Sequence, residues 1–123
     1  MVRQKGELGL NLKKNGKMEI LLHPQFERDA KTLGKKYKSL KDDLDAFMES
    51  LETEPIQGDA LGQNKYKVRL KIASKGKGKS GGGRVITYVR ISEDELWLLT
   101  IYDKSDIENV NDKFLDDLVK HIQ

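Results

Sequence analysis

An uninterrupted alternation of apolar and cationic residues constrains the fold of this chain more than any other feature. It runs over residues 65–72, where Tyr66, Val68, Leu70 and Ile72 alternate with Lys65, Lys67, Arg69 and Lys71. Successive side chains of a β-strand point to opposite faces, so the pattern predicts a half-buried strand with one wholly cationic face. The rest of the chain must supply a sheet and a covering layer for the apolar face.

This strand lies within a stretch that contains no acidic residue. All 20 acidic residues fall at or before Asp59 or at or after Glu93, and nine basic residues lie between those positions. The formal net charge of the chain is only +3, because the other 14 basic residues face all 20 acidic ones, a balance of −6 outside the stretch. Such segregation predicts a surface for a polyanion, and we expect RNA. A solvated basic loop is the alternative, which the strand pattern disfavours.

Composition excludes several other classes of protein. The 123 residues, 37% of them hydrophobic, suit one domain with a single compact core. The absence of cysteine excludes disulfides, thiol catalysis and Cys-ligated metals. The two histidines, His23 and His121, are far apart in the sequence and are expected at the surface rather than as metal ligands. With no long apolar run and no apolar N-terminal segment, we expect a soluble cytoplasmic protein without metal, cofactor or membrane partner.

Periodicity predicts a single α+β domain. The expected elements are, in chain order, a strand at residues 18–22, helices at 24–37 and 40–54, strands at 65–72, 84–91 and 96–102, and a final helix ending near residue 122. Ser39 is expected to cap the second helix, and Asn109 or Asn111 the last one. The order β-α-α-β-β-β-α favours an antiparallel sheet backed by an N-terminal α-hairpin and a C-terminal helix.

The first 17 residues show little apolar periodicity. We therefore expect residues 1–17 to form a poorly ordered leader and residues 18–123 to form the domain. Met18 is a possible native start.

Lysines and glycines alternate directly after the basic strand. The segment Ala73–Ser80 fits a relaxed phosphate-binding-loop pattern, but that loop must open a helix, and three glycines and a strand follow instead. We predict a mobile cationic arm in which Lys75, Lys77 and Lys79 contact RNA phosphates. A flexible hairpin connection is the structural alternative.

The basic strand also holds candidate catalytic residues. Lys67 and Arg69 share one strand face, and crowding by other cations disfavours the protonated form of a lysine, which favours a general-base role for Lys67. Arg84 begins the neighbouring strand and is suited to bidentate contact with a phosphate. The alternative is a strand face kept soluble by basic residues.

Further residues are expected at the edges of this surface. Four of them are predicted to bind RNA or the ribosome: Lys65, Lys71, Arg90 and Tyr102, the last of which lies at a strand end near the proposed surface. Tyr88 and Trp97 are expected in the core instead.

The segments KYKVRLKIASKGKGKSGGGRVITYV (65–89) and LLTIYDKSD (98–106) resemble the RelE/ParE superfamily of bacterial toxins, with the HigB-like and RelE-like branch as the nearest part. The lysine-glycine loop, the following Gly-Gly-Arg and the Tyr-x-Lys strand end occur in the family's order and spacing. The resemblance covers residues 18–122 and implies the β-α-α-β-β-β-α fold and a cognate antitoxin protein. In the RelE-like branch it also implies cleavage of mRNA on the ribosome.

In that chemistry the ribose 2′-OH attacks the adjacent phosphate and leaves a 2′,3′-cyclic phosphate and a free 5′-OH, without a metal. The family's catalytic positions fall on Lys67 and Arg69, on Arg84, and on Lys104, where RelE itself has arginine. The resemblance thus implies Lys67 as general base, Arg69 and Arg84 as phosphorane stabilisers, and Lys104 beside the leaving oxygen.

One family residue has no counterpart here. The tyrosine expected near the start of the last helix is replaced by Asn109, Val110 and Asn111. Its role is vacant, or falls to Tyr102 or to the ribosome. Two other functions therefore stay open: a ParE-like protein that inhibits DNA gyrase without cutting RNA, and a decayed toxin that only binds its antitoxin.

Overall fold

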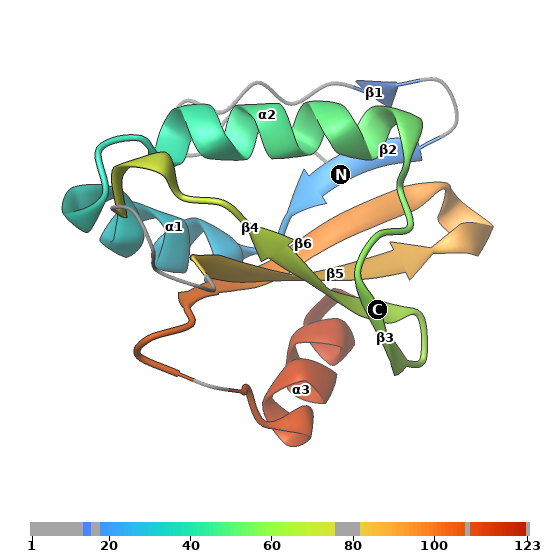
Figure 1. The fold of residues 1–123 in the computed structure, drawn as a ribbon. Coiled ribbons are helices and arrows are strands. Elements are labelled where there is room, and N and C mark those ends of the chain that lie inside the picture. Colours follow the sequence, from blue (N-terminus) through green and yellow to red (C-terminus); the bar gives the residue numbers. More distant parts are fainter. Residues whose placement is uncertain (1–13, 16–17, 76–81, 108, 123) are drawn as a thin grey trace.

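The computed structural model describes residues 14–15, 18–75, 82–107 and 109–122. Its elements, shown in Figure 1, are β1 (Lys14–Asn15), β2 (Met18–Leu22), α1 (Pro24–Lys36), α2 (Leu40–Thr53), β3 (Asp59–Gly62), β4 (Lys65–Leu70), the short 3-10 turn η1 (Ala73–Lys75), β5 (Gly83–Arg90), a second 3-10 turn η2 (Ile91–Glu93), β6 (Glu95–Asp103) and α3 (Asp112–Ile122). The predicted α+β class and the order of the main elements are confirmed. Of the expected leader only β1 lies within the described residues, where it pairs with β2.

The strands form one sheet in the order β1-β2-β6-β5-β4-β3. The ladder from β3 through β4 and β5 to β6 is antiparallel, as predicted. β2 instead runs parallel to β6, so the sheet is mixed rather than purely antiparallel. Parallel neighbours need a long connection, and the two helices and three strands between β2 and β6 provide it.

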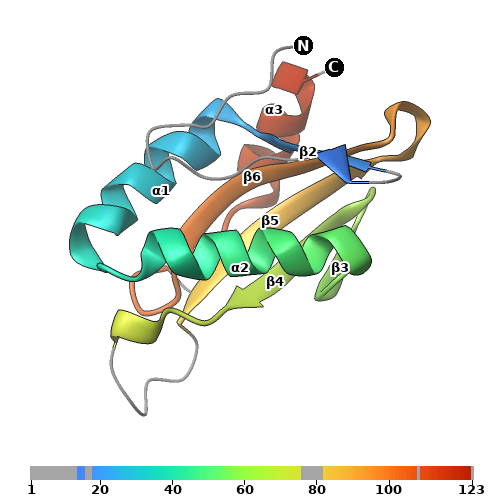
Figure 2. The same cartoon turned by 90° about the horizontal axis from the view of Figure 1, so that it is seen from above.

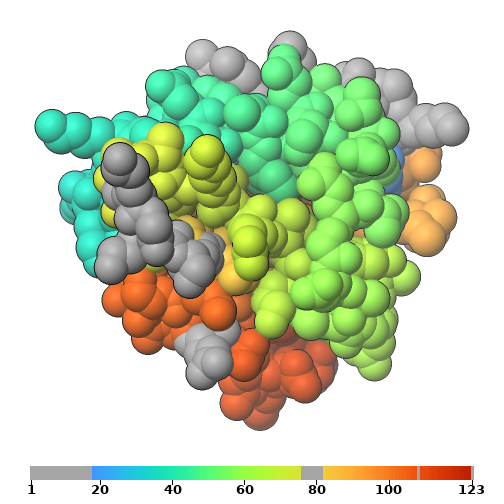
Figure 3. Space-filling model, viewed as in Figure 1, coloured from blue at the N-terminus to red at the C-terminus, as the bar shows by residue number. Residues whose placement is uncertain are grey.

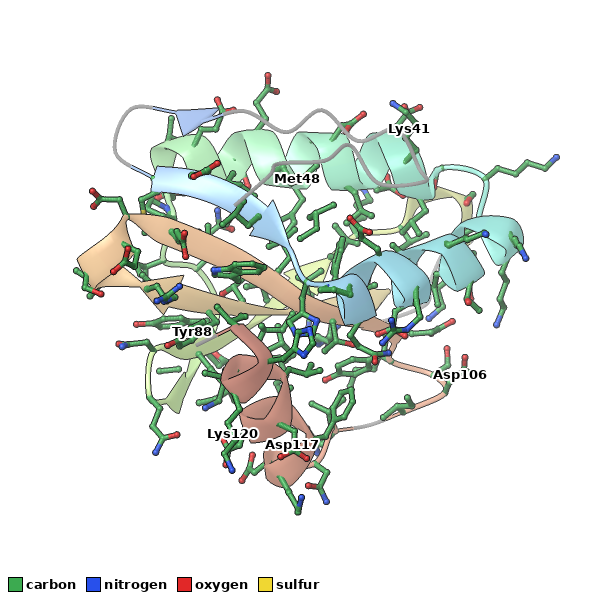
Figure 4. The ribbon with its side chains drawn as sticks, turned by 180° about the vertical axis from the view of Figure 1, so that it is seen from behind. Lys41, Met48, Tyr88, Asp106, Asp117 and Lys120 are labelled. Atoms are coloured by element: carbon green, nitrogen blue, oxygen red, sulfur yellow. The ribbon has the colours of Figure 1, made fainter. Side chains whose placement is uncertain are left out.

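Helices cover both faces of the sheet. Figures 1 and 2 show α1 and α2 on one face and α3 on the other. The apolar stripe of α2 is buried against the first face, and Met48 points from the helix toward the sheet in Figure 4. On the second face, Trp97 and Tyr88 pack in a cluster with Leu115 and Leu118 of α3, which confirms their expected place in the core.

β6 is buried on both sides because helices lie above and below it. Eight of its nine residues are buried, from Leu96 to Asp103. The pairing of β6 with β5 shifts register between Ile86 and Thr87. The shift is a β-bulge, a feature that changes the facing of the residues beyond it. Tyr102 therefore reaches the α3 face opposite Arg84.

Of the two histidines expected at the surface, His23 is buried in the structure. His23 is 3% exposed and caps α1, with Nδ1 accepting a hydrogen bond from the backbone N–H of Gln25. Its Nε2 lies 3.1 Å from the carbonyl oxygen of Leu118 in α3. Burial lowers the pKa of His23, and the hydrogen bond to Leu118 only partly offsets that effect. A residue before α1 thus ties α1 to the helix on the opposite face. At the start of α3 the expected cap is confirmed, because Asn111 accepts from Lys113 and Phe114.

A short edge strand occupies a region that the sequence predicted as a loop. β3 pairs antiparallel with β4, and all four of its residues are exposed. Gly58 precedes it with φ +85°, and Gly62 ends it with φ +93°. These positions favour glycine, yet their surroundings differ. A Cβ on Gly58 would lie 2.2 Å from the carbonyl oxygen of Lys67, whereas a Cβ on Gly62 would meet nothing within 4 Å.

This difference gives a matched pair of substitutions. Gly62→Ala is expected to cost about 1 kcal/mol of unfolding free energy, the cost of the left-handed conformation alone. Gly58→Ala is expected to cost about 2–4 kcal/mol, because the β4 backbone at Lys67 must also shift. Urea unfolding of both variants measures the difference. Equal losses at the two glycines would contradict the close packing of Gly58 on β4.

Candidate functional site

Three polar side chains form a row across the sheet on the face that carries α3. Arg69 of β4 is the cross-strand partner of Arg84 of β5, and Arg84 is the partner of Tyr102 of β6. Directly opposite residues share a face and have Cβ atoms roughly 5 Å apart. Arg69 is exposed, whereas Arg84 is 9% exposed and donates through Nη1 to the carbonyl oxygen of Gly83. Two cationic side chains on one face make this part of the sheet locally positive, which attracts anions.

Lys67 lies two residues before Arg69 on β4, on the same face. Its ammonium donates a hydrogen bond of 3.0 Å to Oδ1 of Asn109, which lies in the segment between β6 and α3. Lys67 and Asn109 line an open pocket of about 290 Å³ together with Ile86, Tyr102, Val110 and Asp112, among other residues. Figure 3 views this side of the molecule, where the yellow-green residues of β4 lie beside the orange and red residues that lead into α3.

Tyr102 is more enclosed than its predicted place near the surface. It is 4% exposed and packs in the cluster beneath α3, although it lines the pocket. Its hydroxyl oxygen is buried and has no hydrogen-bond partner among the described residues. Burial raises the pKa of the Tyr102 hydroxyl, and the positive charge of Arg84 partly offsets the rise. Tyr102 therefore holds a neutral, buried hydroxyl whose hydrogen has no acceptor among the described residues.

Three of the predicted RNA-binding cations have ion-pair partners within the protein. The Lys65 side chain is 7% exposed and lies 3.4 Å from Asp116 of α3. Lys75 is 8% exposed and donates to Asp103. Arg90 lies at the far end of β5 and pairs with Glu95 at 3.0 Å. The structure therefore places these three outside the open part of the basic face. Lys71 is exposed beyond the end of β4, and Lys77 and Lys79 lie outside the described residues.

The fourth candidate catalytic residue, Lys104, directly follows β6. Its backbone N–H donates to the carbonyl oxygen of Gly82, the residue before β5. Lys104 is partly buried at the same end of the sheet as Arg84. Arg69, Arg84 and Lys104 thus lie at one end of three neighbouring strands, and Lys67 lies two residues before Arg69 on β4.

A buried carboxylate organises this end of the sheet. Asp103 is 1% exposed and ends β6. Its oxygens accept hydrogen bonds from Lys75 Nζ at 2.6 Å, from Ser105 Oγ at 2.7 Å and from the Tyr37 hydroxyl. The Lys75 ammonium also donates to the carbonyl oxygen of Gly82, so residues on both sides of the lysine-glycine segment meet at this group.

The hydrogen bonds to Asp103 stabilise its charged form. Burial alone would raise the pKa of Asp103, but the bonds from Lys75, Tyr37 and Ser105 together hold it well below its ordinary value. A carboxylate of this kind stabilises the fold fully above its unfolded-state pKa of about 3.9, and that contribution is lost as the pH falls toward the folded-state pKa.

Two residues of the site were not predicted as functional. Asn109 was expected only as a helix cap, and Asp103 was not singled out. The sequence signal for Asp103 was an acidic residue at the end of the most apolar strand. No sequence signal pairs Asn109 with Lys67, because the contact joins segments 42 residues apart.

No group of three His, Cys, Asp or Glu side chains within the described ranges is placed to hold a metal ion. None of the helices in this part of the chain combines the length and the apolar content that a bilayer crossing requires.

Comparison with known proteins assigns the fold to a family. A family model described as the RelE toxin of the RelE/RelB toxin–antitoxin system matches residues 18–122. Among solved structures, a mutant of E. coli toxin RelE in the free state superposes with a TM-score of 0.55 at 16% identity, covering 85% of this chain and 96% of that one. At this identity the structural match supports the shared fold, and the family model supplies the sequence evidence.

Asp103→Asn should separate the role of the buried charge from that of its shape. We expect a loss of about 3 kcal/mol of unfolding free energy at pH 7, because Lys75 keeps its charge and loses its anionic partner. The gap to wild type should narrow as the pH is lowered from 5 to 2, because the unfolded wild-type chain takes up a proton on Asp103 there while the folded protein still holds the carboxylate charged. Asp106→Asn, at an exposed residue three positions later, should change stability by less than about 0.5 kcal/mol. Urea unfolding at several pH values measures both, and a pH-independent gap would contradict the charge-based role.

Proposed function

The chain belongs to the family of RelE toxins of toxin–antitoxin systems, and from this membership and the geometry of its basic face we propose that it is a ribosome-dependent mRNA endonuclease that inhibits translation. Membership in the family also implies a cognate antitoxin as a protein partner. The substrate in this proposal is mRNA on the ribosome.

The observation that carries the proposal is the row of cations on the α3 face. Lys67 and Arg69 project from one face of β4, and Arg84 is directly opposite Arg69 on β5. Guanidinium groups bind phosphate oxygens in bidentate fashion and stabilise the negative charge that develops on a phosphorane. Cationic side chains on a sheet hold this geometry more rigidly than a loop would.

The proposed reaction is an internal transfer at one phosphodiester. The ribose 2′-oxygen loses its proton and attacks the adjacent phosphorus, the bond to the 5′-oxygen breaks, and that oxygen takes up a proton. The products are a 2′,3′-cyclic phosphate and a 5′-OH end. We assign Lys67 to proton transfer at the 2′-oxygen, Arg69 and Arg84 to the phosphorane, and Lys104 to the leaving oxygen. These cations make the proposed reaction independent of a metal.

The family's tyrosine is missing at the start of the last helix, and Asn109 lies in that segment instead. The segment before α3 supplies Asn109, whose amide oxygen accepts from the Lys67 ammonium. In the proposed mechanism Asn109 orients Lys67 toward the substrate, and Tyr102 lines the same pocket.

A second function follows from the same departure. A ParE-like toxin that inhibits DNA gyrase shares the fold and needs no catalytic tyrosine, and Asn109, Val110 and Asn111 occupy the positions where that tyrosine is expected. The exposed Arg69 next to Lys67 favours the nuclease over this alternative.

Substitutions on the basic face should abolish toxicity without unfolding the domain. Lys67→Met and Arg69→Ala are each expected to lower mRNA cleavage by about 100-fold or more, because each removes a group that acts in the transition state. Lys41→Ala provides the control, since Lys41 is exposed on α2, on the other side of the sheet from α3 in Figure 4. The control should cut like wild type.

Primer extension on mRNA after brief induction in bacterial cells measures the cleavage, and circular dichroism checks that each variant is folded. Cuts within codons in wild type, absent in the two site variants, support the nuclease. Intact mRNA with trapped gyrase–DNA complexes would replace the proposal with the gyrase function. Intact mRNA without any growth defect would indicate a decayed toxin.

A further inference from the structure

The side chain of His23 is buried where the start of α1, strand β6 and the end of α3 meet. It is 3% exposed, and its ring centroid lies 6.4 Å from that of Trp97 in β6 and 5.3 Å from that of His121 in α3. Figure 2 shows the end of α3 near the start of α1. From this geometry we propose that protonation of His23 releases α3 from the sheet, which makes the covering of this face sensitive to pH.

Both ring nitrogens of His23 have partners, and these partners fix the neutral form of the ring. Nδ1 lies 3.0 Å from the backbone nitrogen of Gln25, which can only donate, so Nδ1 accepts and carries no hydrogen. Nε2 lies 3.1 Å from the carbonyl oxygen of Leu118, which can only accept, so Nε2 carries the hydrogen. A second proton would enter at Nδ1, where it would face the N–H of Gln25. The charged ring therefore cannot keep both contacts.

The surroundings of the ring also disfavour a positive charge. Burial lowers the pKa of His23 most, and the hydrogen bond to Leu118 offsets only part of that effect. Two neighbouring groups lower the pKa further, His121 from α3 and Arg28 from α1. On the side of β6 the ring meets the uncharged indole of Trp97. A protonated ring thus gains by reaching water, and it can do so only if one of the elements around it moves away.

Of the two helices that meet at His23, α3 is held less firmly. α1 is fixed by Phe26 and Ala30, which are 0% and 2% exposed in the main apolar cluster. α3 has two buried side chains, Leu115 and Leu118, and Leu118 is also the residue that His23 contacts. With 11 residues, α3 is shorter than the roughly 12–15 residues that an isolated helix needs in water. Release from the sheet therefore also unfolds α3.

Release of α3 reaches the candidate site through the segment that precedes the helix. This segment supplies Asn109, which accepts a hydrogen bond from Lys67, and Val110, which lines the same pocket. Asn111 caps the helix and so connects the segment to it. When α3 unfolds, this connection is lost and Asn109 is no longer held beside Lys67. The proton on His23 thus controls the surroundings of Lys67 from the far end of α3.

The direction of the pH effect follows from the two states of the helix. With α3 released, His23 has its ordinary pKa of about 6.5, and with α3 docked its pKa is lower. Docking is therefore strongest above about pH 6.5 and weakens as the pH falls from there toward the docked pKa. One linked proton changes the docking equilibrium by up to about tenfold between pH 7.5 and pH 5.5. The buried carboxylate of Asp103 stays charged over this range.

Amide hydrogen exchange at pH 7.5 and pH 5.5 measures the release. After correction for the intrinsic exchange rate, we expect the protection of residues 115–122 to fall by up to about tenfold at pH 5.5. It should also lie below the protection of the β5 amides, because α3 opens while the sheet stays folded. Equal α3 protection at the two pH values would overturn the proposal. So would α3 protection equal to that of β5, or a loss confined to the start of α1.

Two histidine variants identify the group that takes up the proton. His23→Asn removes the titrating ring and keeps a residue that caps helices well, so the protection of α3 should no longer depend on pH in this range. His121→Gln is the matched control, because it removes the neighbouring ring and leaves His23 buried against Leu118. Most of the pH dependence should remain in this control. A wild-type pH dependence in His23→Asn, or its complete loss in His121→Gln, would overturn the assignment to His23.

An NMR titration of the histidine rings in the unsubstituted protein tests the same point without a change at His23. The His23 ring should titrate below the ordinary value of about 6.5, together with the loss of α3 protection. A His23 ring that titrates at its ordinary value would contradict the proposal. None of these measurements involves RNA or ribosomes. A chain that cuts mRNA with a pH-insensitive α3 would thus leave the nuclease proposal standing, and release of α3 in a chain that does not cut would do the reverse.

Discussion

The carboxylate of Asp103 is the interaction on which the arrangement of the site depends. It ends the central strand β6 and is held by Tyr37, the residue after α1, by Lys75, and by Ser105. Burying a charge costs several kcal/mol unless it is paired. The positions of Tyr37, Lys75 and Ser105 are therefore coupled, because losing one partner leaves the buried charge less well compensated. Since Asp103 lies between Tyr102 and Lys104, the same contacts that satisfy its charge also set the backbone from which both neighbours project.

The neighbouring row of Arg69, Arg84 and Tyr102 contains arrangements that would cost stability in an ordinary protein core. Arg69 and Arg84 are like charges on facing positions, and within the part of the chain that the structure describes the buried Tyr102 hydroxyl has no hydrogen-bond partner. Functional sites are where folded proteins break the rules that the rest of the chain obeys. The compensation lies on the other face of the same strands, where Val68, Leu70 and Val85 join the apolar cluster under α1 and α2.

Much of this could be predicted from the sequence, because strand parity is a local property. The alternation from Lys65 to Ile72 identified β4 and both of its faces, and the order of elements gave the fold class. Parity could not show which cations are paired, because Lys65 and Lys75 find their partners in Asp116 and Asp103, far along the chain. Nor could it show that Asn109 contacts Lys67 or that β2 runs parallel to β6. These depend on packing between segments that have no sequence relationship.

The parallel pairing of β2 with β6 also determines when the sheet can form during synthesis. β2 pairs with Glu95–Leu98, more than 70 residues later in the chain, so the first long strand waits for the last one. Contacts of such long sequence separation slow folding, because the entropy of closing the loop is paid before the strands are in register. During synthesis the α1–α2 hairpin leaves the ribosome before β6, so the strand that it packs on is still missing. The row of Arg69, Arg84 and Tyr102 likewise lacks Tyr102 until β6 has emerged. The charged face therefore cannot be assembled before the strand that holds Asp103 has left the ribosome.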